Sequence, residues 1–63
     1  MIEIKYYYKN KFGDWIEAWV YFNSVDKAVR FLYKCKGDPK MYYSGELACD
    51  DPYDLQEINR RFR

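Results

Sequence analysis

Two stretches near the N-terminus alternate between apolar and other side chains, as β-strands do. They are IEIKYYYK at residues 2–9 and WIEAWVYF at residues 15–22, and the loop NKFGD joins them. Two alternating runs across a short glycine-containing loop predict a β-hairpin. If the loop is symmetric about Phe12, Ile4 faces Val20 and Tyr6 faces Ala18, and every pair on that side of the hairpin is apolar. A slip of one residue would mix the two sides, so this register is the one predicted.

The second of these strands is hydrophobic on both of its sides. One side carries Ile16, Ala18, Val20 and Phe22, and the other carries Trp15, Trp19 and Tyr21 with only Glu17 between them. A small protein normally buries one side of such a strand and leaves the other in water. The pattern therefore raises the question of what covers the second side.

The period changes to 3.6 residues after the hairpin, which predicts a helix. Asn23 and Ser24 are both good N-cap residues, and Gly37 followed by Pro39 is typical of a left-handed cap at a helix end. The apolar positions between them fall on one stripe, which consists of Val25, Ala28, Val29, Leu32 and Cys35.

Alternation returns at residues 40–49 and predicts a third strand, in which Gly45 suggests a bulge or a close approach. The alternative is a turn at YSGE between two short strands. A second helix is predicted to follow, with Asp51 as its N-cap and Pro52 in its first turn. Its apolar stripe consists of Leu55, Ile58 and Phe62. Its basic residues Arg60, Arg61 and Arg63 lie at the C-terminal end, where a helix dipole favours them.

These elements predict a single α+β domain over residues 1–63, with the order ββαβα. A helical crossover makes the second and third strands parallel to each other, so the simplest sheet places the first strand between them. That sheet is antiparallel throughout, in the order 2-1-3, and a right-handed crossover packs the first helix on its aliphatic side. The pattern does not determine which side the second helix covers. Cys35 and Cys49 then lie at opposite ends of a strand about 26 Å long, too far apart for a disulfide.

Size and charge narrow the class of protein. A chain of 63 residues forms one domain and must pack efficiently, because a domain of this size buries only about 60% of its unfolded surface. Its 22% aromatic content argues against disorder, and its 11 basic and 10 acidic residues give no bulk attraction for nucleic acid. Charged residues interrupt every apolar run, so we expect no signal peptide, no transmembrane helix and a cytoplasmic location.

The residue types and motifs that enzymes commonly use for catalysis are scarce in this sequence. Histidine, the commonest general base and metal ligand, is missing, the glycines are scattered, and two cysteines do not make a zinc site. Asp50, Asp51 and Asp54 are clustered, but an Asp-Asp-Pro sequence is typical of a helix start. We therefore expect no enzyme activity, no metal, no cofactor and no small-molecule substrate.

The candidate functional surface is the second side of the sheet, called here the aromatic face. Three explanations of it compete. The second helix covers it, a protein partner or a second copy covers it, or it stacks the bases of a single-stranded nucleic acid. We favour the protein, because Tyr and Trp are enriched at interface hot spots. The residues expected to take part are Lys5, Tyr7, Trp15, Glu17, Trp19, Tyr21 and Tyr42.

A second candidate surface is basic. Lys27, Arg30 and Lys34 share one stripe of the first helix. Such a stripe is usually a solvated helix face, and otherwise it contacts phosphates or an acidic protein. The three arginines of the second helix would extend it if the two helices lie side by side.

No motif of a known family is present. In size and composition the chain resembles the accessory proteins of phages and mobile elements, several of which occlude a host enzyme such as a defence nuclease. We expect a small non-enzymatic module that binds protein through the aromatic face, as a homodimer or as an inhibitor or adaptor of a target. The alternative is a nucleic-acid-binding protein that uses the aromatic face and the basic helix stripe.

Overall fold

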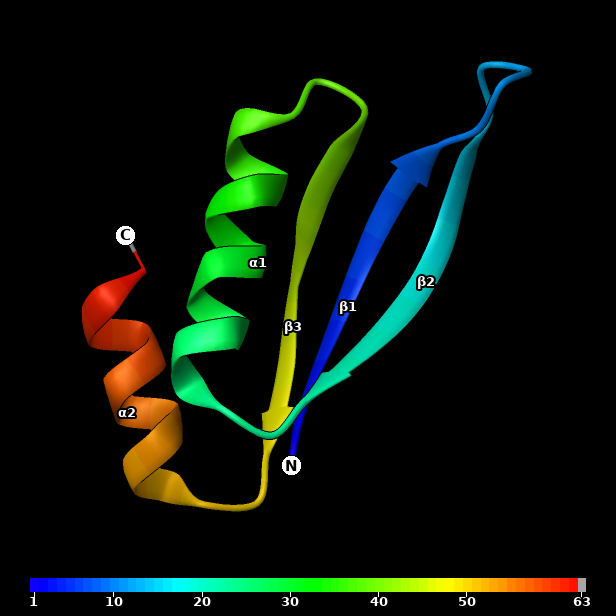
Figure 1. The fold of residues 1–63 in the computed structure, drawn as a ribbon. Coiled ribbons are helices and arrows are strands. Elements are labelled where there is room, and N and C mark those ends of the chain that lie inside the picture. The colour runs from blue at the N-terminus through cyan, green and yellow to red at the C-terminus, as the bar shows by residue number, and fades with distance from the viewer. Residues whose placement is uncertain (63) are drawn as a thin grey trace.

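The hairpin, the crossover and both helices are present in the computed structural model, which describes residues 1–62 (Figure 1). The elements are β1 (Ile2–Lys9), β2 (Trp15–Phe22), α1 (Val25–Gly37), β3 (Met41–Cys49) and α2 (Pro52–Arg61). β1 is the middle strand and pairs antiparallel with both neighbours, which gives the sheet order β2-β1-β3. The predicted α+β class, element order and sheet topology are confirmed.

The register of the hairpin is also the predicted one. Ile4 pairs with Val20 and Tyr6 with Ala18, and the pairing extends from Ile2 with Phe22 to Lys9 with Trp15. The side chain of Asn10 fixes the loop, because its Oδ1 accepts hydrogen bonds from the backbone N–H groups of Phe12 (2.9 Å) and Asp14 (3.0 Å).

A bulge interrupts the pairing of β1 with β3, where Gly45 suggested one. Ile4 pairs with Leu47 and Tyr6 pairs with Tyr43. The single residue Lys5 of β1 therefore lies opposite three residues of β3, numbers 44–46. Gly45 adopts a φ of 93°, in the left-handed region that glycine tolerates best. The extra residues in β3 are even in number, so side chains on either side of the bulge still alternate in phase.

The two helix starts follow the predicted capping, and one helix end does not. Ser24 caps α1 and Asp51 caps α2, where Asp51 Oδ1 accepts a hydrogen bond of 2.9 Å from Tyr53 N. The predicted left-handed cap at Gly37 is wrong: α1 includes Gly37, and the extended residue Asp38 caps it. Asp38 makes the turn into β3 itself, because its carbonyl accepts from Met41 N and its carboxylate accepts from Lys40 N.

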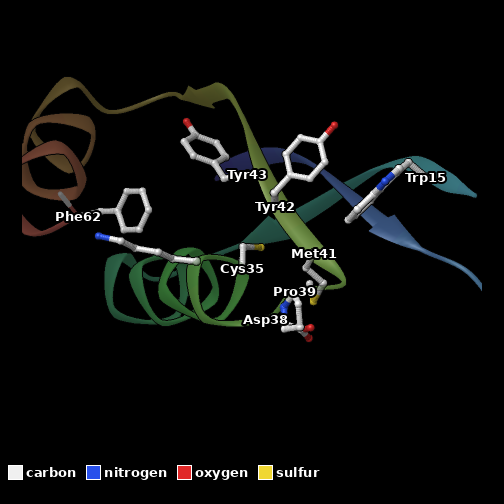
Figure 2. A pocket seen from close by; sticks show the side chains of 9 residues that line it. Trp15, Cys35, Asp38, Pro39, Met41, Tyr42, Tyr43 and Phe62 are labelled. Carbon is white, nitrogen blue, oxygen red and sulfur yellow. The ribbon is translucent and has the colours of Figure 1, made fainter. Parts of the chain in front are cut away.

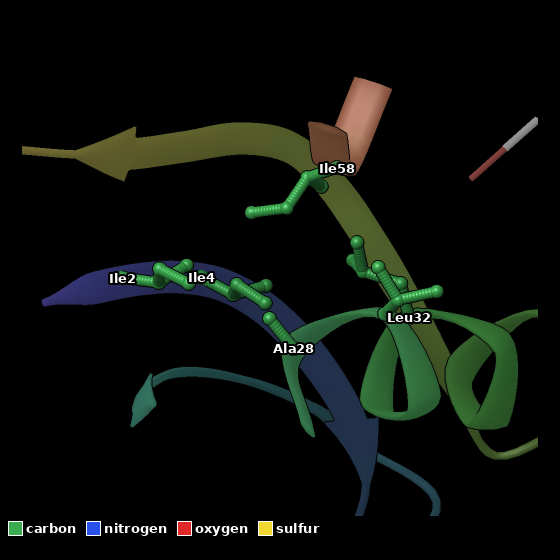
Figure 3. Close-up of a cluster of buried hydrophobic side chains, with 6 residues drawn as sticks. Ile2, Ile4, Ala28, Leu32 and Ile58 are labelled. Atoms are coloured by element: carbon green, nitrogen blue, oxygen red, sulfur yellow. The ribbon is translucent and has the colours of Figure 1, made fainter. Parts of the chain in front are cut away.

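Both helices lie on the same side of the sheet. Figure 3 shows the buried cluster that they form with it, in which Ile58 of α2 lies near Ile2 and Ile4 of β1 and near Leu32 of α1. Ile58 is 2% exposed, whereas Ile4 and Leu32 are 0% exposed. Tyr33 and Arg61 hold the helices together, since the Tyr33 hydroxyl donates to the Arg61 carbonyl over 2.7 Å. The packing of α1 on the aliphatic side of the sheet is confirmed, and α2 packs beside it.

Both cysteines are free thiols. Cys35 is buried in the last turn of α1, and this burial raises the pKa of its thiol. Over residues 1–62, neither helix combines the length and the hydropathy that crossing a membrane requires.

Candidate partner-binding face

The aromatic face is uncovered. Because α1 and α2 both pack on the other side of the sheet, large aromatic side chains remain open to solvent on this one. Trp15 and Trp19 are each 43% exposed, Tyr42 is 45% exposed and Tyr21 is 53% exposed. The explanation in which the second helix covers these residues is therefore excluded.

Three aromatic rings hold one another in place at one end of this face. Tyr7 pairs across the strands with Tyr42, and their rings stack with centroids 4.9 Å apart. Trp15 meets Tyr42 edge-on at 5.0 Å, and Lys9 Nζ lies 5.8 Å from the Trp15 ring. Contacts of this kind fix the orientation of large rings before any partner arrives. A partner would meet a preorganised surface, which lowers the entropy that binding costs.

Lys5 occupies the centre of the face with two carboxylates around it. Its Nζ lies 3.4 Å from Glu46 Oε2 and 3.7 Å from Glu17 Oε2, and its side chain is 17% exposed. Desolvation acts to lower the pKa of Lys5, but the charges of Glu17 and Glu46 outweigh it and the pKa is raised. Lys5 and Glu17 were expected on this face. Glu46 was expected on the same side of the third strand as Tyr42, but its ion pair with Lys5 was not predicted, because that contact depends on the bulge at Gly45.

The charges of the aromatic face do not favour a polyanion. Glu3, Glu17 and Glu46 outnumber Lys5 and Lys9 on it, so its net charge is negative. Lys5, the central cation, is already engaged by carboxylates of the same chain. Binding of single strands relies on cations that follow the phosphates past the stacking rings. The charges of the aromatic face thus provide no attraction for a nucleic-acid backbone.

The basic stripe of α1 is a separate surface. Lys27, Arg30 and Lys34 are exposed, whereas Ala28 and Leu32 of the same helix face the sheet, so the stripe points away from the aromatic face. The structure does not bring the two candidate surfaces together.

The arginines of α2 do not extend the basic stripe as free charges. Arg61 Nη1 lies 2.6 Å from Asp26 Oδ1 of α1, and Arg60 pairs with Glu57. The hydrogen bond and the charge of Arg61 lower the pKa of Asp26. Arg63 lies outside the described residues.

A hollow of about 590 Å³ borders the aromatic face at the start of β3 (Figure 2). Trp15 and Tyr42 form its wall on the aromatic side, and Phe62 and Cys35 form its wall on the helix side. Sequence reasoning missed it, because its walls come from four elements that only the fold brings together. The lining residues are Trp15, Cys35, Lys36, Asp38, Pro39, Met41, Tyr42, Tyr43 and Phe62.

At its opposite end the aromatic face is acidic and carries a smaller hollow. It measures about 160 Å³ and is lined by Met1, Glu3, Ala48 and Asp50. The N-terminal amine lies 3.3 Å from Asp50 Oδ2. Asp51, the neighbour of Asp50, caps α2 as expected.

Within residues 1–62, no three acidic or sulfur-bearing side chains gather closely enough to hold a metal ion. Comparison with protein-family models, curated proteins and solved structures finds no match to this chain. Its function has to be inferred from its own surface.

Proposed function

We propose that this chain is a small non-catalytic binding module of the cytoplasm, and that its aromatic face packs against a protein. The observation that carries the proposal is the exposure of Trp15, Trp19, Tyr21 and Tyr42 on a side of the sheet that neither helix covers. Contiguous apolar patches on small proteins mark interaction sites, and Trp and Tyr dominate the energy of interfaces. The chain would act by occluding or recruiting its partner, as an inhibitor or adaptor.

Affinity in this proposal comes mainly from burying the rings. The stacked group of Tyr7, Trp15 and Tyr42 supplies the rigid anchor, and Trp19 and Tyr21 extend the contact along β2. Lys5, which is tied to Glu17 and Glu46, supplies a charged centre that fixes the orientation of the partner. Charged groups of this kind give specificity more than raw affinity.

Affinity capture tests the proposal. Wild-type protein at dilute concentration is used to capture partners from a lysate of the source organism, or of its host if the gene is viral, with and without nuclease. The comparison is a Trp15→Ser/Trp19→Ser double variant, whose folding is checked by circular dichroism. A Lys27→Ser/Lys34→Ser variant is the matched control, because it changes two exposed residues on the far side of the molecule.

The expected result is a protein that resists nuclease, is lost with the tryptophan variant and is retained by the control. Its binding to purified chain should depend weakly on salt, because aromatic burial is the main term. Capture that disappears with nuclease and falls steeply with salt would instead indicate nucleic acid. Equal capture by the tryptophan variant and the wild type would rule out the aromatic face.

A further inference from the structure

The pairing of the strands arranges the aromatic face in rows that run across the sheet. At one end, Trp15 pairs with Lys9, and Lys9 N donates a hydrogen bond of 2.8 Å to the carbonyl of Lys40. At the other end, Tyr21 pairs with Glu3, and Glu3 pairs with Ala48. The first row is therefore aromatic and basic, and the last row is aromatic and acidic.

Shape changes along the face together with charge. The basic end carries the stacked rings of Tyr7, Tyr42 and Trp15, and the hollow of about 590 Å³ opens beside them. At the acidic end, β3 contributes only the small side chain of Ala48 to the face. The hollow of about 160 Å³ lies there between Glu3 and Asp50. One end thus projects stacked rings and positive charge, and the other carries negative charge around a small hollow.

We propose that a second copy of this chain packs face to face on the aromatic face, about a two-fold axis that crosses the strands. This inference deepens the proposed function, on which it rests, by naming one partner. The axis lies at the level of Tyr6 and Ala18, so the basic row of each copy covers the acidic row of the other. Such an interface is self-complementary, as two-fold contacts must be.

The contacts of this dimer can be read from the rows. Lys9 of one copy faces Glu3 of the other, and Trp15 faces Tyr21. Lys40 reaches the hollow between Glu3 and Asp50, and Tyr7 covers the aliphatic stem of Lys5. Each contact occurs twice. Two sheets that stack in this way keep their strands within about 30° of each other, as in β-sandwiches.

Charge selects this orientation over the other two-fold arrangement. An axis along the central strand would place Lys9 of one copy on Lys9 of the other, and Glu3 on Glu3. Like charges placed opposite each other across an interface are strongly unfavourable. Only the axis across the strands brings opposite charges together at both ends.

The size of the face sets the expected strength. Eight residues at ~3.3 Å and three strands at ~4.8 Å make a face of about 26 by 14 Å. This places the contact toward the small, transient class of interfaces. We therefore expect a dimer that dissociates at micromolar concentrations.

Sedimentation equilibrium from about 1 µM to about 1 mM, with a reducing agent to exclude disulfide-linked species, measures the association directly. We expect a shift from monomer to dimer over this range, accompanied by a shift of tryptophan emission to shorter wavelength as Trp15 and Trp19 leave water. A chain that stays monomeric throughout would overturn the inference. Capture of a target by that monomer through Trp15 and Trp19 would still support the proposed function, so the two failures are distinguishable.

Charge reversal tests the orientation. In Lys9→Glu each copy places Glu opposite Glu3, and in Glu3→Lys each copy places Lys opposite Lys9. Each variant alone should dimerise at least about 10-fold more weakly than the wild type. A 1:1 mixture of the two variants should associate as the wild type does, because both contacts of the mixed dimer then join opposite charges. Lys27→Glu, the same change on the exposed side of α1, should leave the association unchanged.

Dilution followed by NMR gives a readout that does not depend on variants. Backbone amide shifts of β1, β2 and β3 should change with concentration, while those of the exposed side of α1 should not. Shift changes centred on α1, or a mixture of the two variants that associates no better than either alone, would contradict this dimer.

Discussion

Both sides of the sheet carry large hydrophobic side chains, which are buried on one side and exposed on the other. The inner side presents Ile2 and Ile4, which are 2% and 0% exposed beneath α1 and α2. The aromatic side presents Trp15 and Trp19, each of which is 43% exposed. Aliphatic side chains pack closely under a helix, whereas aromatic rings with a polar edge can remain exposed at a surface. The same strands thus bury one side in the core and leave large aromatic rings exposed on the other.

The largest expected effect is on the inner side. Leu32→Ala removes a 0%-exposed side chain between the sheet and α1 and should lower the free energy of unfolding by about 2–5 kcal/mol. A domain this small has little stability to lose, so much of the chain should unfold. Urea denaturation followed by circular dichroism measures the change. A loss below about 1 kcal/mol would mean that the inner side is not the main core.

The bulge in β3 should give an intermediate effect. Gly45→Ala places a side chain at a φ of 93°, which costs about 1–2 kcal/mol even though the added Cβ has open space around it. Thermal or urea unfolding measures the loss. Gly37→Ala is the matched control, because Gly37 lies inside α1 without a positive φ, and alanine there should be neutral or stabilising. Equal effects of the two substitutions would contradict the bulge.

A smaller loss of stability is expected on the aromatic side. Trp19→Ser should lower the free energy of unfolding by about 1 kcal/mol or less, because the ring is already largely in water. The same change should weaken partner binding much more than it weakens folding. Unfolding as severe as that of Leu32→Ala would erase the difference between the two sides and make Trp19 part of the core.

The smallest expected effect is on the stability of the protein at acidic pH. Arg61 lowers the pKa of Asp26 from its ordinary value of 3.8, so the stabilisation from this pair is complete above that value. It is lost as the pH falls through the lowered pKa. Asp26→Asn should remove that part of the pH dependence, so that the variant loses less stability than wild type below about pH 4. Urea midpoints measured between pH 6 and pH 2 provide the comparison, and identical pH profiles would contradict a linked Asp26–Arg61 pair.

Local patterns were enough for most of the fold. The alternation of residues 2–9 and 15–22 determined the hairpin and its register, because a slip by one residue would expose every aliphatic side chain. The helix starts at Ser24 and Asp51 followed from side-chain capping, which involves only neighbouring residues. Gly37 misled the prediction because glycine permits a left-handed cap without requiring it, and Asp38 closes α1 through its own turn.

The sequence by itself determined which residues form the aromatic face, since successive side chains of a strand point to opposite sides of the sheet. Only the tertiary structure decided that this face stays open. The apolar stripe of α2 fits either side of a sheet, and its choice of the inner side depends on the joint packing of Ile58 with Leu32 and Ile4. The ion pair between Glu46 and Lys5 and the hollow between Trp15 and Phe62 were likewise decided by the fold, because each joins residues from different elements.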